Sequence, residues 1–487
     1  MKTIKNIVSG IQKRHCLVGC ILLACACLQS CKKFIEIPPP TTQLITSTVF
    51  SNDAAATSAM LAIYKLMVSN GESLNMSKNN GLVADELTNY SSSPFSLGPY
   101  RNALNATDGF GPWQNAYIYI YQANAVIEGL QKNAGVSLSV KQQLTGEAKF
   151  IRAFWHFYLT NCYGAASLQL TTDYIVNEGL ARTPRMQVLQ QIITDLTDAQ
   201  QLLSDQYVDA TSITSTPDRV RPNKMVATAL LARAYLYFGD YDSKNVNDYK
   251  NAEVASTSVI SNSQYSLISP LTNSNYVFNI SNNAEAIWQL ATPLPANNGA
   301  TRDGQTYVLI SKPTNVSLSQ QLIGSFEAGD NRKNIWVGSF TASGVTYSFA
   351  NKYKTRTGST IAEYVMVLRL AEQYLIRAEA RAQQGNTSGA IADLNIIRNR
   401  AGLANYAGPT DQASLLTAIL HERQVEFFCE WGHRWFDLNR TGNTNSVMSI
   451  VTPQKGGIWS SDGHQLLFPI RSIQISLDPN LSQNPGY

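Results

Sequence analysis

The stretch LRLAEQYLIRAEARAQQGNTSGAIADLNIIRN, residues 368–399, decides the fold of this chain. Small and apolar side chains recur in it every three or four positions on both sides of Gly385. This spacing gives each half one apolar face and predicts two helices, Leu368–Gln384 and Ser388–Asn399. Glycine readily takes the left-handed backbone that ends a helix, so Gly385 is expected to close the first of the two.

A second pair of the same kind lies earlier in the chain. Lys224–Phe238 is expected to form a helix that ends at Gly239, and Tyr249–Ile260 supplies its partner. Helix–turn–helix pairs with alanines at the contact positions are typical of tetratricopeptide units. Such units bury their apolar faces only by stacking on one another, so the two pairs predict a larger helical body.

Two longer segments, residues 112–132 and 142–163, have the same periodicity and are also predicted to be helices. Together with the two pairs they predict a fold dominated by α-helices. The expected arrangement is a single domain over residues 46–487, with a tetratricopeptide-like scaffold at about 46–260 and 361–445.

Two stretches interrupt the helical pattern, residues 83–112 and about 262–360. Both are rich in Asn, Ser, Thr, Gly and Pro, and the second contains minor strands at Ala286–Leu290 and Val345–Phe349. Long irregular segments in a compact body usually carry function. A sugar ring offers apolar C–H faces and hydroxyl groups, so its binder needs aromatic planes beside amide or guanidinium donors. Both stretches contain that mixture, and the predicted ligand-binding residues are Asn89, Tyr90, Phe95, Tyr100, Asn297, Arg302 and Tyr307.

Other aromatic and sulfur-containing side chains are expected in the core. Four tryptophans recur at helical spacing or lie in a short strand, and these are Trp113, Trp155, Trp288 and Trp435. Of the seven cysteines only Cys162 and Cys429 lie beyond residue 31. We expect both to be buried as small apolar side chains, with a disulfide between them left open.

Composition and charge exclude one class of partner. The chain has 487 residues, of which 44% are apolar and 15% are charged, as in a globular protein with a sizeable core. Its formal charge is +4, but residues 1–30 hold four of the 38 basic residues and no acidic residue, which leaves 34 of each sign elsewhere. A neutral body without basic clusters does not attract phosphate backbones, so nucleic acid is not an expected partner.

The N-terminal residues are predicted to be a targeting signal followed by a lipid anchor. Residues 1–30 combine a basic start with the apolar run CLVGCILLACACL, which is too short to span a bilayer and is typical of a signal peptide. The tetrad LQSC at residues 28–31 resembles a bacterial lipobox, which implies acylation of the Cys31 thiol. Residues 31–45 contain a proline run and are expected to form a tether from this lipid to the domain.

The polar residues of the body predict no catalytic set, metal or cofactor. His421 and Glu422 start a zinc-protease motif, but Val425 stands where the second histidine ligand belongs. Glu422, Glu426 and Glu430 follow at i, i+4 and i+8, and a pair of such acids could serve a glycosidase. We expect them instead to form a structural ion network, neutralised by arginines that are close in sequence: Arg423, Arg434 and Arg440.

Several motifs in the same order resemble the SusD/RagB family of outer-membrane nutrient-binding lipoproteins. Residues 422–442, ERQVEFFCEWGHRWFDLNRTG, resemble its C-terminal signature, and the ending QNPGY at 483–487 resembles its usual finish. Further similar motifs lie at residues 150–154, 369–380 and 397–403. The resemblance spans nearly all of residues 34–487, with one departure at Arg471, where the family often has a proline.

The resemblance implies a SusD-like fold and a binding function without chemistry. Family members sit on the outer membrane facing the cell exterior, held by a lipid, and deliver a nutrient oligosaccharide to a SusC-like TonB-dependent transporter. Three alternatives stay open: a peptide-binding member of the family, a lipid-anchored hydrolase that uses the acidic face near Glu426, and a scaffold for protein assembly.

Overall fold

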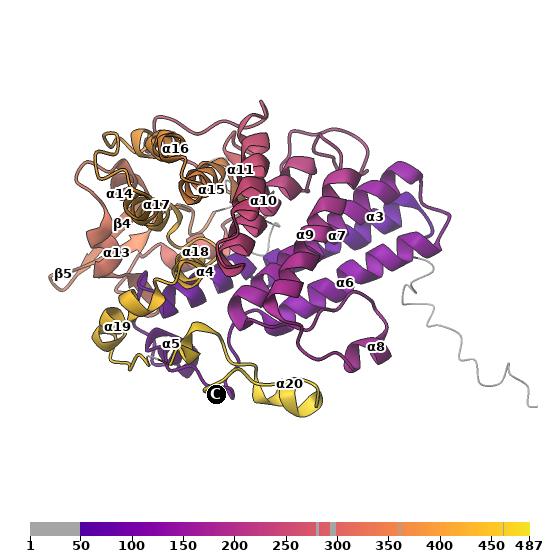
Figure 1. Ribbon diagram of the computed structural model, residues 1–487, viewed down its shortest axis with the longest axis horizontal. Coiled ribbons are helices and arrows are strands. Elements are labelled where there is room, and N and C mark those ends of the chain that lie inside the picture. The colour runs from indigo at the N-terminus through magenta and orange to yellow at the C-terminus, as the bar shows by residue number, and fades with distance from the viewer. Residues whose placement is uncertain (1–48, 279–281, 293–298, 359, 362, 461) are drawn as a thin grey trace, which may run out of the picture. The chain divides into compact units, whose positions relative to one another are not determined.

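The computed structural model describes residues 49–487 apart from 279–281, 293–298, 359, 362 and 461. The predicted signal peptide, Cys31, the tether and Asn297 lie outside the described residues. Val49–Tyr487 forms one unit by its internal contacts. Helices dominate this unit, as predicted, and three small sheets accompany them (Figure 1).

Long helices form a continuous series in the described part of the chain, in which each helix packs against the next (Figure 1). In order, the series is α6 (Trp113–Lys132), α7 (Leu138–Tyr163), α9 (Arg185–Leu202), α10 (Lys224–Tyr241), α11 (Val246–Ile260), α15 (Leu370–Gln383) and α16 (Thr387–Arg400). The predicted pairs are α10 with α11 and α15 with α16, and α11 packs on α15. The two pairs therefore stack on each other, as the sequence predicts.

Other helices flank this series. At the N-terminal end α3 (Asp53–Ser69) packs against α6 and α7, while α17 (Gln412–Phe427) packs against α15 and α16. The helix α18 (His433–Thr441) connects α17 to α4 (Glu72–Val83) by contacts with both. The remaining helices are α5 (Pro94–Tyr100), α8 (Tyr174–Glu178), α12 (Arg302–Tyr307), α13 (Gln320–Ser325), α14 (Asn331–Trp336), α19 (Thr444–Gln454), α20 (Ser472–Leu477) and the 3-10 turn η2 (His464–Leu466).

The two predicted glycine turns have different outcomes. Gly385 has a φ of +77° and ends α15, and the side chain of Asn386 then accepts a hydrogen bond from Gly389 N at 3.0 Å to start α16. Gly239 does not end α10, which continues to Tyr241. A Cβ on Gly239 would lie 2.9 Å from the Tyr249 ring, so this glycine instead allows α11 to approach α10 closely.

Each sheet contains two antiparallel strands. The pairs are β1 (Leu87–Asn89) with β3 (Val316–Leu318), β2 (Ala286–Leu290) with β6 (Val365–Arg369), and β4 (Val337–Ala342) with β5 (Val345–Ala350). The two predicted strands are confirmed as β2 and β5. The β1–β3 pair joins the two irregular stretches, because β1 belongs to the first and β3 to the second.

The first irregular stretch is more ordered than its composition predicts. Residues 83–112 contain β1 and also the short helix α5, which begins at Pro94 and buries Ser96 and Pro99. Proline suits a first helical position because its missing N–H has no partner there in any case. This helix places Phe95 at the surface, where 63% of the residue is exposed.

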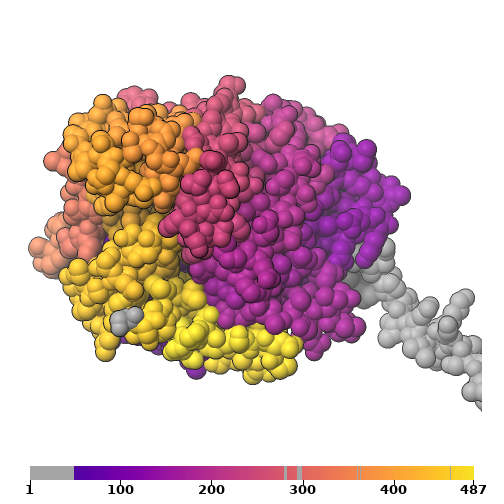
Figure 2. All heavy atoms as spheres, in the orientation of Figure 1, coloured from indigo at the N-terminus to yellow at the C-terminus, as the bar shows by residue number. Residues whose placement is uncertain are grey.

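The core is divided between the scaffold and the irregular region. All four tryptophans predicted to be core residues are buried, and they belong to the main apolar cluster. A second cluster lies in the irregular region around Trp336, Phe278 and Tyr307. Cys162 and Cys429 are buried, as expected, and both are free thiols, which answers the question of a disulfide between them. Figure 2 shows the C-terminal segment, in yellow, lying along the lower edge of the face in view.

Candidate functional site

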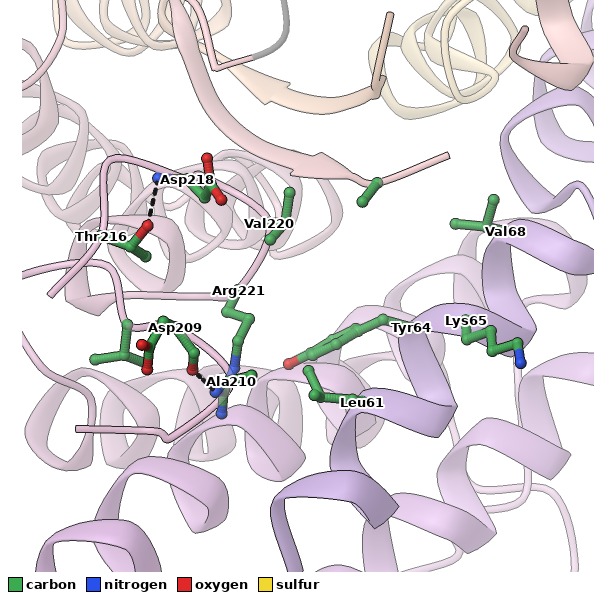
Figure 3. A pocket seen from close by; sticks show the side chains of 12 residues that line it. Leu61, Tyr64, Lys65, Val68, Asp209, Ala210, Thr216, Asp218, Val220 and Arg221 are labelled. Carbon is green, nitrogen blue, oxygen red and sulfur yellow. Dashed lines mark hydrogen bonds between the residues drawn. The ribbon is translucent and has the colours of Figure 1, made fainter. Parts of the chain in front are cut away.

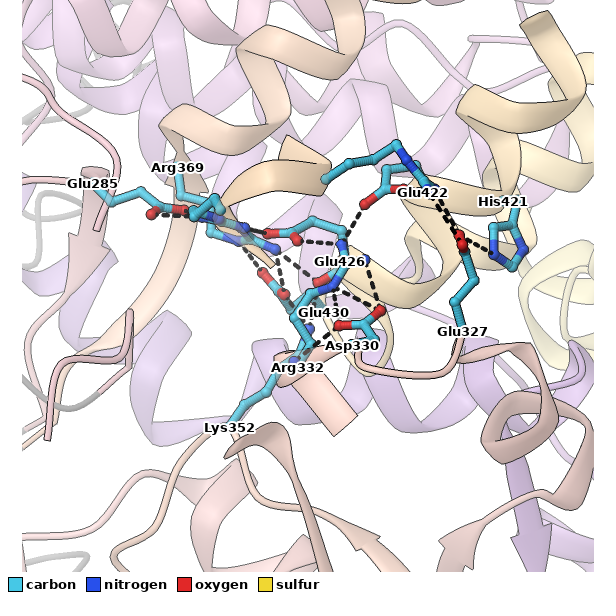
Figure 4. A network of polar contacts seen from close by, with 12 residues as sticks. Glu285, Glu327, Asp330, Arg332, Lys352, Arg369, His421, Glu422, Glu426 and Glu430 are labelled. Carbon is cyan, nitrogen blue, oxygen red and sulfur yellow. Dashed lines mark hydrogen bonds and ion pairs between the residues drawn. The ribbon is translucent and has the colours of Figure 1, made fainter. Parts of the chain in front are cut away.

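Glu422 and Glu426 of α17 and Glu430 of the turn after it form a buried ion network with basic residues from distant segments (Figure 4). Arg332 Nη1 lies 2.6 Å from Glu422 Oε1 and 2.9 Å from Glu426 Oε2. Glu426 also pairs with Arg369 and with Arg400. Burial would raise the pKa of the Glu426 carboxyl, but the three guanidinium groups around it outweigh this and hold the pKa well below its usual range. The Glu426 carboxylate is therefore held in its charged state by protein partners.

The ion network was predicted, but its predicted partners are wrong. Asp437 pairs with Arg423 and Arg440, while Arg434 pairs with Asp85. Successive residues on a helix point in directions about 100° apart, so neighbours in sequence such as Glu422 and Arg423 serve different faces. Helix α17 also ends at Phe427, and Glu430 joins the network from the turn that follows, where it pairs with Lys352 and Arg369.

Four predicted ligand residues come from the β1–α5 segment. Asn89 is half-buried, and 38% of Tyr90 is exposed. The Tyr90 hydroxyl lies 3.1 Å from Ser317 Oγ, and its ring meets that of Tyr347 edge to face with 5.7 Å between centroids. Tyr100 is half-buried, with Lys455 Nζ 5.4 Å from its ring centroid. Phe95 is therefore the most exposed of these four side chains.

The other predicted residues that the structure describes, Arg302 and Tyr307, lie on α12, which packs against α4. Arg302 is exposed and donates a hydrogen bond to Ser69 O at 3.3 Å. Tyr307 is only 4% exposed, and its hydroxyl lies 3.0 Å from Ser77 Oγ. The Tyr307 ring therefore offers no accessible plane to a ligand, because it belongs to the second apolar cluster. The two irregular stretches thus meet at α4, which contacts α5, β1 and α12.

A cleft of about 280 Å³ opens between α4, α5 and the loop before α6. Asn75, Lys78 and Asn79 line it from α4, where their spacing places them on one helix face. Phe95 lines it from α5 and Asn115 from the first turn of α6. It therefore combines one exposed aromatic ring with several amide groups and an amine.

Polar groups in this cleft are only partly satisfied by the protein. Glu72 accepts hydrogen bonds from Asn115 Nδ2 at 2.7 Å and from the Tyr119 hydroxyl at 2.8 Å, and burial raises the pKa of its carboxyl. Burial also lowers the pKa of the Lys78 amine, which has no hydrogen-bond or ion-pair partner among the described residues. Asn80 Oδ1 is buried and is likewise unpaired within the part of the chain that the structure describes. Free donors and acceptors of this kind suit a ligand rich in hydroxyl groups.

The sequence analysis found Phe95 but missed the residues on α4. A signal for them exists, because α4 contains Asn75, Asn79 and Asn80 within twelve residues. Asparagine is a poor helix former, so three of them in one helix conflict with local propensity. Conflicts of this kind are expected at functional sites.

A second cavity, of about 360 Å³, lies between α3 and residues 208–221 (Figure 3). Leu61, Val68 and Val220 supply much of its wall. Its central polar groups already satisfy one another, because the Tyr64 hydroxyl and the Arg221 guanidinium both donate to the buried Glu147 carboxylate. This cavity offers fewer free polar groups to a sugar than the cleft beside α4.

Two family models match this chain, one in each half. The model described as "SusD family" matches residues 296–487, and the model described as "Starch-binding associating with outer membrane" matches residues 41–238. A relative named SusD-like protein P25, from Formosa agariphila, is 23% identical over 94% of this chain and 97% of its own length.

Solved structures show the same fold. A SusD superfamily protein from Bacteroides thetaiotaomicron has a TM-score of 0.74 at 22% identity and covers 89% of this chain and 100% of that one. A structure described as a laminarin-binding SusD-like protein has a TM-score of 0.70 at 23% identity, covering 90% of this chain and 100% of its own. Among the described residues, every helix is too short or too polar to cross a membrane.

Proposed function

This chain belongs to the SusD/RagB family, and from that premise we propose that it captures a nutrient oligosaccharide in the cleft beside α4 and delivers it to a SusC-like TonB-dependent transporter. The family consists of carbohydrate-binding proteins rather than enzymes, and its members associate with the outer membrane. The ion pairs of the Glu422–Glu430 network agree with this assignment, because arginines and a lysine already occupy those carboxylates.

The observation that supports the sugar site is the pairing of Phe95 with the polar face of α4. The exposed Phe95 ring offers a plane for the C–H face of a sugar, while Lys78 and Asn79 have no partner of their own among the described residues. An open site with few apolar contacts supports modest affinity. We expect dissociation constants between about 1 mM and 1 μM, which correspond to about 4–8 kcal/mol.

The anchor and the transporter belong to the same proposal. Acylation of Cys31 and a tether over residues 31–45 would hold the domain at the outer membrane, facing the cell exterior. Labelling with a fatty-acid analogue should mark the wild type and leave Cys31→Ala unmarked. Gentle detergent extraction of the lipidated protein should then yield the transporter with it, and repeated recovery of the protein alone would contradict the partnership.

Affinity electrophoresis tests the sugar site without knowing the nutrient beforehand. The mature soluble domain is run in gels that contain starch, laminarin, xylan, mannan, pectin or mucin glycans. We expect one of these to retard the wild type and Tyr174→Ala, a control that removes an exposed ring from α8, and to leave Phe95→Ala unretarded. Free migration of the wild type in every gel, with binding to a peptide library instead, would replace the sugar by a peptide.

A further inference from the structure

Another hollow, distinct from the cavity of Figure 3, lies beside the cleft, between α6 and α20. It measures about 450 Å³ and is lined by Tyr117, Ile118 and Tyr121 of α6, with Leu477 of α20 opposite them. Tyr121 is 51% exposed and Leu477 is 72% exposed. In Figure 1, α20 lies below α6 with α5 to its left. The hollow therefore presents an accessible aromatic ring that the fold does not use for packing.

Polar groups in this hollow lack partners. The Gln122 Oε1 atom is buried and makes no hydrogen bond to a described residue. The side-chain amides of Gln114, Gln169 and Gln474 also line the hollow and make no hydrogen bond to any described residue. A buried polar atom without a partner costs free energy, so a ligand that supplies the missing bonds is favoured.

A third hollow connects the two. It measures about 230 Å³ and shares Gly109, Phe110, Gly111 and Asn115 with the cleft beside α4. It shares Trp113, Gln114 and Gln474 with the hollow beside α20. The three hollows therefore adjoin one another in a row along the first turns of α6.

Each end of the row has an exposed aromatic ring beside side-chain amides, and the end beside α20 also has apolar walls. Phe95 lies at one end with the amides of α4, and Tyr121 lies at the other with the glutamine amides. The middle is polar, with Asp108 and Arg471 on its walls. Two aromatic platforms joined by a polar channel suit a chain of sugar units and are larger than a single sugar needs.

We propose that these three hollows form one extended groove that binds a linear oligosaccharide, with one end of the chain at Phe95 and the other at Tyr121. This inference rests on the proposed sugar-binding function and adds a second subsite and a preference for chain length. An apolar surface of the transporter is less suitable, because side-chain amides that make no hydrogen bond to a described residue lie at both ends of the row.

The groove is tested by titrating oligosaccharides of different lengths against variants with a substitution at one end of the groove or the other. Oligosaccharides from two to eight units are prepared from the polysaccharide that retards the wild type, and each is titrated calorimetrically. We expect the affinity of the wild type to rise at least tenfold from three to six units. Tyr121→Ala and Gln474→Ala should remove most of that rise and leave the trisaccharide affinity unchanged, whereas Phe95→Ala weakens both lengths. Leu138→Ala, an exposed apolar change on α7, should behave as the wild type.

Each contrary result has a distinct meaning. If no polysaccharide retards the wild type, the proposed function fails and the groove fails with it. If the wild type binds but Tyr121→Ala and Gln474→Ala keep full affinity for six units, the sugar site stands and the extended groove is wrong. Loss of transporter co-purification in Tyr121→Ala with unchanged sugar affinity would make the hollow beside α20 a protein contact and overturn the groove.

Discussion

The ion network of α17 and the cleft beside α4 are both polar, and they differ in whether their groups have partners. Glu426 is surrounded by three arginines and is fully buried. Lys78 in the cleft has no partner among the described residues. A polar group that the protein satisfies contributes to the fold, while one left unsatisfied is available to a ligand. The two regions therefore differ in their central ionisable groups, since the Glu426 carboxylate has several protein partners and the Lys78 amine has none among the described residues.

Removing Glu426, the centre of the ion network, should cause the largest loss in the free energy of unfolding. Glu426→Ala removes the one carboxylate that Arg332, Arg369 and Arg400 share, and losing a partner in a buried ion network costs about 3–5 kcal/mol. Urea denaturation should show this loss. Glu327→Ala is the matched control, because it breaks an ion pair with Arg398 whose carboxylate is 41% exposed, and such pairs contribute at most about 1 kcal/mol. Equal stability of the two variants would contradict the structural role of the network.

Glu86, between the two regions, should make stability depend on pH. Burial, then the nearby Asp85, raises the pKa of Glu86 to about 8 from its ordinary 4.5. The folded protein then binds a proton that the unfolded chain releases, so stability should fall as pH rises from about 5 to about 8, by at most about 1.4 kcal/mol per pH unit.

The matching variant is Glu86→Gln, which imitates the protonated side chain. It should match the wild type at pH 5 and be more stable at pH 8, as urea titrations at both pH values can show. The exposed Glu178→Gln should follow the wild type throughout. A wild-type stability that is flat between pH 5 and 8 would show that Glu86 is charged in the folded protein.

Removing the unpaired amine of Lys78 in the cleft should lower the affinity for the oligosaccharide and leave the stability of the fold unchanged. Lys78→Met keeps the length of the side chain and removes its donor. We expect about a tenfold loss of oligosaccharide affinity, equal to about 1.4 kcal/mol, with no loss in melting temperature. Calorimetry and thermal denaturation measure the two quantities. A variant that binds normally would place Lys78 outside the site.

The smallest change should come from Tyr307, which the structure places in the core. Tyr307→Phe removes the hydroxyl contact with Ser77 and keeps the buried ring, so stability should fall by about 1 kcal/mol. Its oligosaccharide affinity should equal that of the wild type. A tenfold loss of affinity in the folded variant would restore Tyr307 to the site.

Much of the fold could be predicted because helical periodicity and glycine turns are local signals. The pairs α10–α11 and α15–α16, the strands β2 and β5 and the buried tryptophans all follow from such patterns. The partners of Glu426 could not be predicted, since Arg332, Arg369 and Arg400 reach it from separate segments. Composition alone suggested loops at 83–112, and it gave no account of α5.

Part of the candidate site could also be predicted from local signals in the sequence. Phe95 could be found because an exposed aromatic residue in an irregular stretch is a local signal. Burial of Tyr307 depends on how α12 packs against α4, and that contact joins residues more than 200 positions apart. The amides of α4 line a cleft only because α5 and the loop before α6 form its other walls. That arrangement depends on the folded chain and has no local signal in the sequence.

The most direct test of the distinction between satisfied and unsatisfied polar regions is calorimetric titration of Phe95→Ala and Glu430→Ala side by side, with the hexasaccharide of the retarding polysaccharide. The account predicts that Phe95→Ala keeps the wild-type melting temperature and loses at least tenfold in affinity. Glu430→Ala should melt earlier and bind with wild-type affinity in its folded fraction. A stable Glu430→Ala that fails to bind, together with a Phe95→Ala that binds normally, would contradict the account and place the ligand at the ion network.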